Sequence, residues 1–193
     1  MKPTKPTKRI LISVTDKTGL EKFKRLTDIG WEIISTGGTL TKLQELGIPC
    51  MHIEEITHFP EMMNGRLKTL HPNVFGGILA DRSKPEHMNA IAEHSIGTID
   101  IVVVNLYDFA GKPGIENIDI GGPSLLRAAA KNGAHTVPIH DTEDYSKVIQ
   151  EIIENGEVSK KTKQYLVTKV FLYTGKYDLD IHFWITYQKD LFV

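Results

Sequence analysis

The stretch from Asp119 to Asn132 gathers the groups best suited to chemistry, and it reads Asp-Ile-Gly-Gly-Pro-Ser-Leu-Leu-Arg-Ala-Ala-Ala-Lys-Asn. Its carboxylate can accept a proton, and the paired glycines let the backbone turn tightly and approach a ligand. Pro123 suits the first turn of a helix, which would carry the cation of Lys131 about 13 Å along its axis. A substrate lying along this helix could contact both charges, so the stretch predicts a site for acid–base chemistry. An ordinary surface connection leading into a helix is the alternative.

A run of small residues follows a predicted strand and opens a predicted helix. It consists of Ser35, Thr36, Gly37, Gly38 and Thr39. Backbone N–H groups at the positive end of a helix bind phosphate, and ligands of open α/β sheets bind where the strands end. Ser13 and Lys17 follow the first predicted strand at the same edge and could add a hydroxyl and a cation. We therefore expect a phosphate site here, with a plain helix-capping turn as the alternative.

Two further segments add polar groups to this set. Arg66, Lys68 and Thr69 alternate with apolar residues in a loop, where two cations could face one anion. A solvated basic loop is the alternative, and spacing alone favours it. Asn105 and Tyr107 end the clearest buried strand of the chain, where an asparagine can cap a turn or bind a ligand. Together these groups fit a phosphorylated small molecule that undergoes acid–base chemistry.

Composition narrows the class of protein. The chain has 193 residues, of which 40% are hydrophobic and 24% charged, as in globular domains with a sizeable core. Its formal net charge of -1 argues against nucleic acid as a partner. Cys50 is the single cysteine, so no disulfide can form within the chain, and the histidines show no metal-binding spacing. No signal peptide and no apolar run of about 18 residues is present. We therefore expect a cytoplasmic protein with no metal and no membrane partner.

The hydrophobic pattern predicts how these groups are positioned. We expect strands over residues 10–14, 31–34, 49–53, 76–80, 99–104 and 136–139. We expect helices that end at Gly30 and Gly47, others over 86–95, 123–131 and 143–155, and a last helix from near Ser159. This alternation is typical of an α/β protein whose mostly parallel sheet is covered by helices. It predicts one domain over residues 10–193, preceded by a disordered basic tail at 1–9.

Five motifs taken together carry a family resemblance. They are Ser-Val-Thr-Asp-Lys-Thr-Gly-Leu at 13–20, Ser-Thr-Gly-Gly-Thr at 35–39, Arg-Leu-Lys-Thr-Leu-His-Pro at 66–72, Asn-Leu-Tyr at 105–107, and the stretch at 119–132. In this order they closely resemble the inosine monophosphate (IMP) cyclohydrolase domain of the bifunctional purine biosynthesis proteins. The resemblance implies a three-layer, methylglyoxal synthase-like α/β fold with C-terminal helices. It also implies closure of formylated aminoimidazole carboxamide ribotide (FAICAR) to IMP with loss of water and without a cofactor.

The resemblance also assigns roles to residues. The catalytic set is Lys68, Tyr107, Asp119 and Lys131. The substrate-binding set is Ser13, Lys17, Ser35, Thr36, Gly37, Gly38, Thr39, Arg66, Thr69, Asn105, Ile120, Gly121 and Gly122. In such a site the carboxylate would accept the proton of the attacking carboxamide, while the cations, the tyrosine and the glycine amides would stabilise the developing oxyanion.

The chain departs from this family pattern in places that bear on rate. The loop at 110–118 is short, and Asp108, Phe75 and Tyr173 stand where proline, histidine and histidine are expected. The transformylase half is missing, so that activity is not expected, and a homodimer and a separate transformylase partner stay open.

Two other classes of function share the fold. One is methylglyoxal synthase, which eliminates phosphate from a triose phosphate. Its further catalytic aspartate motif is missing, and the 66–72 motif would then be unexplained. The other is a regulatory nucleotide-binding module such as that of carbamoyl phosphate synthetase, which would not need the catalytic set.

Overall fold

The computed structural model describes residues 7–188 and places a five-stranded parallel sheet in the middle of the molecule. Its strands are β1 (Arg9–Val14), β2 (Glu32–Ser35), β3 (Met51–His52), β4 (Ile101–Asn105) and β5 (Val137–Ile139), in the spatial order β3-β2-β1-β4-β5. The two central strands pair in register from Ile10 opposite Ile101 to Val14 opposite Asn105. Because helices cover both faces, the central strands are apolar almost throughout.

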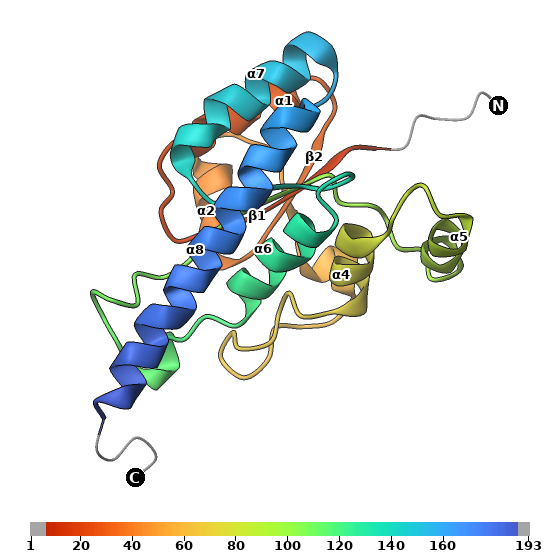
Figure 1. The fold of residues 1–193 in the computed structure, drawn as a ribbon. Coiled ribbons are helices and arrows are strands. Elements are labelled where there is room, and N and C mark those ends of the chain that lie inside the picture. The colour runs from red at the N-terminus through yellow and green to blue at the C-terminus, as the bar shows by residue number, and fades with distance from the viewer. Residues whose placement is uncertain (1–6, 189–193) are drawn as a thin grey trace, which may run out of the picture.

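Helices cover both faces of this sheet (Figure 1). One face packs against the 3₁₀ helix Leu20–Phe23, α1 (Lys24–Thr27), α2 (Gly37–Glu45) and α7 (Tyr145–Asn155). The opposite face packs against α4 (Pro72–Leu79) and α6 (Gly121–Lys131). The shorter elements are α3 (Glu54–Thr57), α5 (Pro85–Glu93) and 3₁₀ turns at Ile115–Asn117 and Thr142–Asp144. The three-layer α/β architecture is therefore as predicted.

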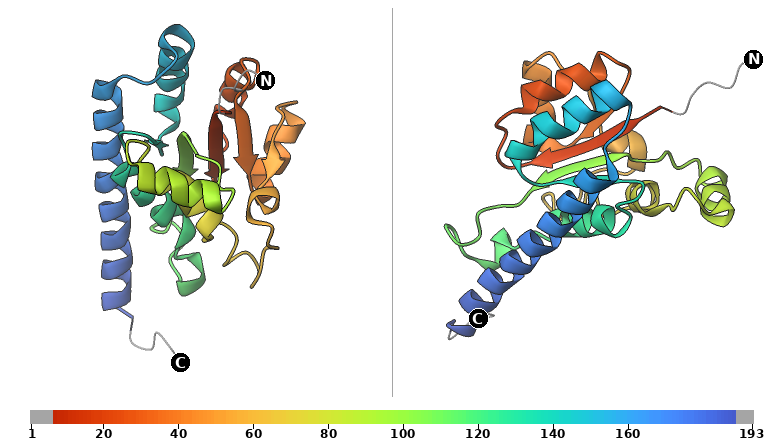
Figure 2. Two further views of the ribbon diagram at one scale, coloured as in Figure 1. Left: turned by 90° about the vertical axis from the view of Figure 1, so that its right-hand side faces the viewer. Right: turned by 45° about the horizontal axis from the view of Figure 1, so that its top comes forward.

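The last helix, α8 (Lys160–Thr186), contacts both β5 and α6. Figure 2 shows it running along one side of the molecule, past the β5 edge of the sheet. Leu166 packs into the core on one face of the sheet, and Val170 and Tyr177 pack into the core on the other. Ser159 caps the helix by accepting a hydrogen bond from the Thr162 amide, which confirms the predicted start.

The predicted strand at 76–80 is wrong, because this segment lies in α4. The helix begins at Pro72, and the His71 ring caps it by accepting a hydrogen bond from the Asn73 amide. A Cβ on Gly77 would lie 2.4 Å from the carbonyl oxygen of Gly97, so the glycine permits a close approach of two backbones. A short apolar run bounded by glycines does not distinguish a strand from a buried helix.

The disordered tail expected at residues 1–9 lies only partly within the described residues. Residues 1–6, most of the segment expected to be disordered, lie outside the described residues, as do 189–193. Arg9 already belongs to β1, where its amide donates to Asp100, and the Lys8 ammonium lies 2.8 Å from the same carboxylate. Within residues 7–188, no helix combines the length and apolar character needed to cross a membrane.

Candidate functional site

The predicted phosphate loop lies where β1 and β2 end. Thr36 has an extended backbone and precedes α2, so the first amides of that helix open toward the strand ends. Gly37 has a φ of 46°, a left-handed conformation that favours glycine, and both loop glycines are exposed. The Thr36 hydroxyl lies 3.3 Å from that of Ser13. The Lys17 ammonium would lie 3.9 Å from a Cβ on Gly38, so a cation stands beside the free amides.

Two hydroxyls of this loop donate hydrogen bonds to the backbone of β1. Ser35 donates to the carbonyl oxygen of Ile12 at 2.7 Å. Thr39 donates to the carbonyl oxygen of Val14 at 2.9 Å and accepts from its amide at 3.0 Å. Both side chains are buried, so they fasten the loop to β1. The groups left to face an anion are the hydroxyls of Ser13 and Thr36, the Lys17 ammonium and the glycine amides.

Asn105 holds the loop that follows β1 through hydrogen bonds of its side chain. Its side-chain oxygen accepts from the amides of Thr15 and Asp16 at 2.6 and 2.9 Å, and its amide group donates to the Asp16 carbonyl at 3.0 Å. The turn-capping alternative is therefore the one that the structure adopts. Tyr107, two residues further along, keeps 55% of its surface exposed and is free to meet a ligand.

Asp119 stands at the start of α6, beside the 66–72 loop. Its Oδ1 accepts a hydrogen bond from the Gly122 amide at 2.8 Å. A Cβ on Gly122 would lie 2.5 Å from Oδ2 of the same carboxylate and 2.6 Å from the Leu106 side chain, so any other residue would require these side chains to shift. A Cβ on Gly121 would lie 3.2 Å from the Thr69 hydroxyl. Two predicted segments that are distant in sequence therefore meet at this corner.

Burial raises the pKa of the Asp119 carboxyl above its ordinary value, although the Gly122 amide, the Lys68 ammonium and the Gly121 amide act in the opposite direction. A carboxylate with a raised pKa is a stronger base than an exposed one. Lys68 is close enough to lower this pKa, which puts a cation next to the candidate base. The corner thus joins a proton acceptor to a group that can stabilise an oxyanion.

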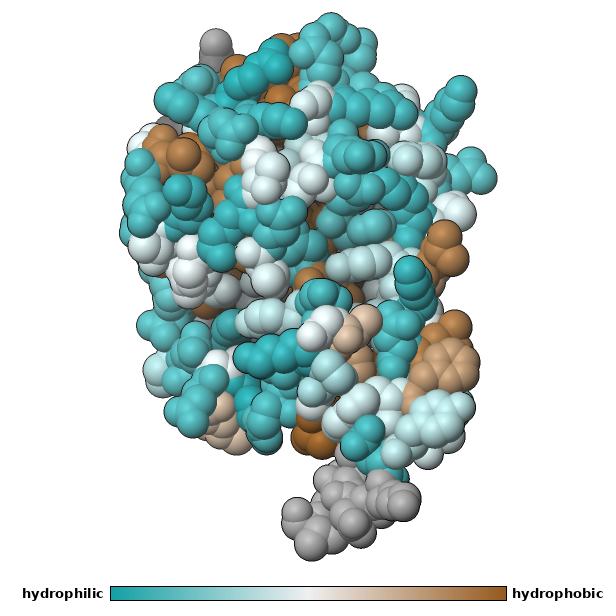
Figure 3. Space-filling model, turned by 90° about the vertical axis from the view of Figure 1, so that its left-hand side faces the viewer, coloured by the Kyte–Doolittle hydropathy of each residue, from teal (hydrophilic) through white to brown (hydrophobic). Residues whose placement is uncertain are grey.

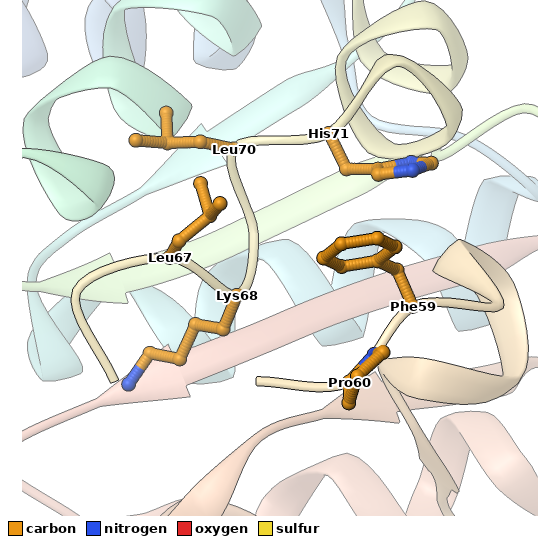
Figure 4. Close-up of a pocket in the computed structure, with 6 residues that line it drawn as sticks. All are labelled: Phe59, Pro60, Leu67, Lys68, Leu70 and His71. Atoms are coloured by element: carbon orange, nitrogen blue, oxygen red, sulfur yellow. The ribbon is translucent and has the colours of Figure 1, made fainter. Parts of the chain in front are cut away.

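A small cavity of about 180 Å³ adjoins this corner (Figure 4). It is lined by Phe59, Pro60, Leu67, Lys68, Leu70 and His71. The rings of Phe59 and His71 face each other with their centres 6.4 Å apart. A wider cavity of about 460 Å³ opens over the ends of β1 and β4, between Asn105 and Tyr173.

Three further predicted residues are exposed. Arg66 is exposed and forms an ion pair with Glu116 of the short 110–118 loop, and the Glu116 carboxylate raises the pKa of the guanidinium. Ile120 keeps 60% of its surface exposed. Lys131 is the last residue of α6, roughly 15 Å from its first residue at 1.5 Å per residue, and it is exposed. The structure does not bring Lys131 to Asp119 within one chain, so its catalytic role stays a prediction.

The departures from the family pattern have structural roles here. Asp108 accepts a hydrogen bond from the Gly111 amide at 3.1 Å and so turns the short loop. Phe75 packs against the core between the sheet and α6. Tyr173 accepts a hydrogen bond from the Leu106 amide, and Tyr177 accepts one from the Asp119 amide. Sequence analysis gave Tyr173 only as a departure from the family pattern and did not single out Tyr177, so their contacts with the site were missed.

Comparison with known proteins identifies the family. Residues 19–136 match the model of the MGS-like domain, and residues 129–192 match that of the AICARFT/IMPCHase bienzyme. The chain belongs to the MGS-like domain family.

Particular relatives are similar over nearly the whole chain. The chain is 50% identical over 192 residues to the bifunctional purine biosynthesis protein PurH of Streptococcus mutans serotype c, and 51% identical over 189 residues to PurH of Listeria monocytogenes. These alignments cover 94% and 93% of this chain but 37% of each relative's length. The crystal structure of ForH has a TM-score of 0.82 and 32% identity, covering 91% of this chain and 97% of ForH.

Among residues 7–188, no group of three or more histidine, cysteine, aspartate or glutamate side chains is placed to hold a metal ion.

Proposed function

We propose that the chain is an IMP cyclohydrolase of purine biosynthesis, which closes FAICAR to IMP with loss of water. The observation that carries this proposal is the corner at the start of α6, where Thr69 lies beside Gly121 and the Lys68 charge acts on the Asp119 carboxylate. The phosphate loop between β2 and α2 would supply the second half of a ribonucleotide site. The similarity to PurH proteins supports the same reaction.

The chemistry follows from these groups. The carboxamide nitrogen attacks the formyl carbon and loses a proton, which the Asp119 carboxylate accepts. The formyl oxygen becomes an alkoxide, and the Lys68 ammonium stabilises its charge. The Gly122 amide donates a hydrogen bond to the Asp119 carboxylate and so orients the base. Departure of the alkoxide oxygen as water requires two protons: Lys68 or the exposed Tyr107 hydroxyl can donate one, and the protonated Asp119 can return the other. As the C=N bond forms, the formamide nitrogen loses its proton, which restores the proton given by Lys68 or Tyr107. The reaction moves protons and water alone, so acid–base groups suffice.

The test is an absorbance assay in which the purified chain is mixed with the formylated ribotide. We expect turnover by the wild-type chain, and no turnover would overturn the proposal. A parallel assay with a triose phosphate tests the synthase alternative. Binding of IMP without turnover of FAICAR would favour the regulatory alternative.

A further inference from the structure

Two tyrosines on α8 reach the backbone at both ends of the connection between β4 and α6, which carries Tyr107 and Asp119. The Tyr173 phenol oxygen accepts a hydrogen bond from the Leu106 amide at 3.0 Å. The Tyr177 phenol oxygen accepts one from the Asp119 amide at 2.7 Å and lies 3.4 Å from the carbonyl oxygen of Asn117, to which it donates. The tyrosines are four residues apart, so they lie on one face of the helix.

These hydrogen bonds act at the two ends of the connection between β4 and α6, where the chain leaves the sheet and where it enters the helix. Leu106 immediately precedes Tyr107, and Asp119 is the proposed base itself. Between them runs the largely exposed 110–118 segment. An exposed loop holds its ends loosely unless a rigid element orders them. The face of α8 that carries the tyrosines is such an element, because it is packed against α6 and β5.

The orientation of each ring is fixed by packing that does not involve its hydroxyl. The His140 ring stacks on Tyr173 with centres 4.1 Å apart and planes 8° from parallel. The Phe109 ring meets Tyr177 edge-on with centres 6.1 Å apart. Changing either tyrosine to phenylalanine would therefore keep the ring in place and remove only its hydroxyl, which accepts from a backbone amide and, in Tyr177, also donates to the Asn117 carbonyl.

We propose that Tyr173 and Tyr177 are positioning residues, which hold the backbone of Tyr107 and Asp119 at the separation needed for ring closure. This inference rests on the proposed function, because it concerns the rate of that reaction. Displacing a catalytic group by about 1 Å can cost on the order of 10²-fold in rate. The phosphate loop is built on β1 and α2, so it does not depend on these bonds.

The experiment compares Tyr173→Phe, Tyr177→Phe and the double variant with the wild-type chain. Tyr165→Phe is the matched control, because it removes the same oxygen from a half-exposed ring on the same helix. We expect kcat to fall about 10-fold or more for Tyr177→Phe, with a smaller fall for Tyr173→Phe and an unchanged KM for the ribotide. Tyr165→Phe should leave kcat unchanged. Exchange of the Leu106 and Asp119 amide hydrogens, measured without substrate, should be faster in the matching variants.

The two readouts separate this inference from the proposed function. An active wild-type chain whose kcat is unchanged by Tyr177→Phe would overturn the inference, as would a raised KM with unchanged kcat. A wild-type chain with no turnover would overturn the proposed function. Amide exchange would then still decide whether the tyrosines order the two loops, and equal exchange in the wild-type and variant chains would show that they do not.

Discussion

At the scale of single residues, the environment that would make Asp119 a base also has a cost in stability. Its pKa is raised in the folded chain, because burial disfavours the charged form. The folded state therefore binds this proton more tightly than the unfolded state does. The contribution of the group to stability is fully present below the unfolded pKa and is lost as the pH rises through the folded pKa.

Asp119→Asn tests both roles at once. Asparagine keeps an oxygen that can accept from the Gly122 amide, but it cannot accept the substrate proton. We expect kcat to fall about 10²-fold or more. We also expect a melting temperature at pH 7 that is equal to or above that of the wild-type chain. Wild-type kcat in a folded Asp119→Asn protein would remove this residue from the chemistry.

Gly122 offers a steric test of the same corner. An added Cβ would collide with the Asp119 carboxylate and with Leu106, so Gly122→Ala must displace the base. We expect a loss of activity and a destabilisation of about 1–3 kcal/mol, measured by urea unfolding. Gly175→Ala is the control, since its Cβ would meet nothing within 4 Å and helix propensity should raise stability by up to about 1 kcal/mol. Equal activity and stability for Gly122→Ala and the wild-type chain would contradict the close contact.

At the scale of elements, the loop between β2 and α2 contains both residues proposed to bind the phosphate and residues that hold the loop to β1. Thr36→Ala and Lys17→Ala should raise the KM for the ribotide more than they lower kcat, because the phosphate is remote from the reacting atoms. Steady-state kinetics decide this, and a lost kcat at unchanged KM would contradict the phosphate assignment. Some loss of kcat is compatible with it, since remote binding can orient the reacting end.

Thr39→Ala is expected to act on folding instead. It removes two hydrogen bonds between a buried hydroxyl and Val14, which leaves the backbone of β1 unpaired there. We expect a destabilisation of about 1–3 kcal/mol, measured by urea unfolding. A wild-type free energy of unfolding would show that the hydroxyl does not fasten the loop.

Local patterns predicted most elements but not how they meet. Strand-then-helix alternation gave the parallel sheet, since capping residues and apolar runs are local signals. The strand predicted at 76–80 was wrong because Gly77 permits a close backbone contact with Gly97, which the sequence does not display. The hydrogen bonds of Tyr173 and Tyr177 were not predicted, because their partners lie 67 and 58 residues away in the sequence.

At the scale of the whole molecule, α8 joins the two faces of the sheet to the candidate site. Figure 3 shows a mostly hydrophilic face, with hydrophobic groups scattered near its margins. The exposed side chains of the last turns of α8 include Leu179 and Phe183. The N-terminal half of α8 is held by ion pairs, because the Lys169 ammonium lies 2.7 Å from the carboxylates of both Asp141 and Asp144.

Lys169→Met should therefore loosen α8 and leave two carboxylates unpaired, one of them nearly buried. We expect a destabilisation of about 1–3 kcal/mol at pH 7, smaller than for a fully buried pair because all three groups keep some exposure. The hydrogen bond from Lys169 lowers the pKa of Asp141, so this contribution is present above the unfolded pKa and is lost as the pH falls through the folded pKa. The difference between the variant and the wild-type chain should thus be large at pH 7 and shrink below about pH 4. Urea unfolding at both pH values measures it, with exposed Lys161→Met as the control on the same helix. A difference that is independent of pH would show that the stem of Lys169, rather than its charge, fastens the helix.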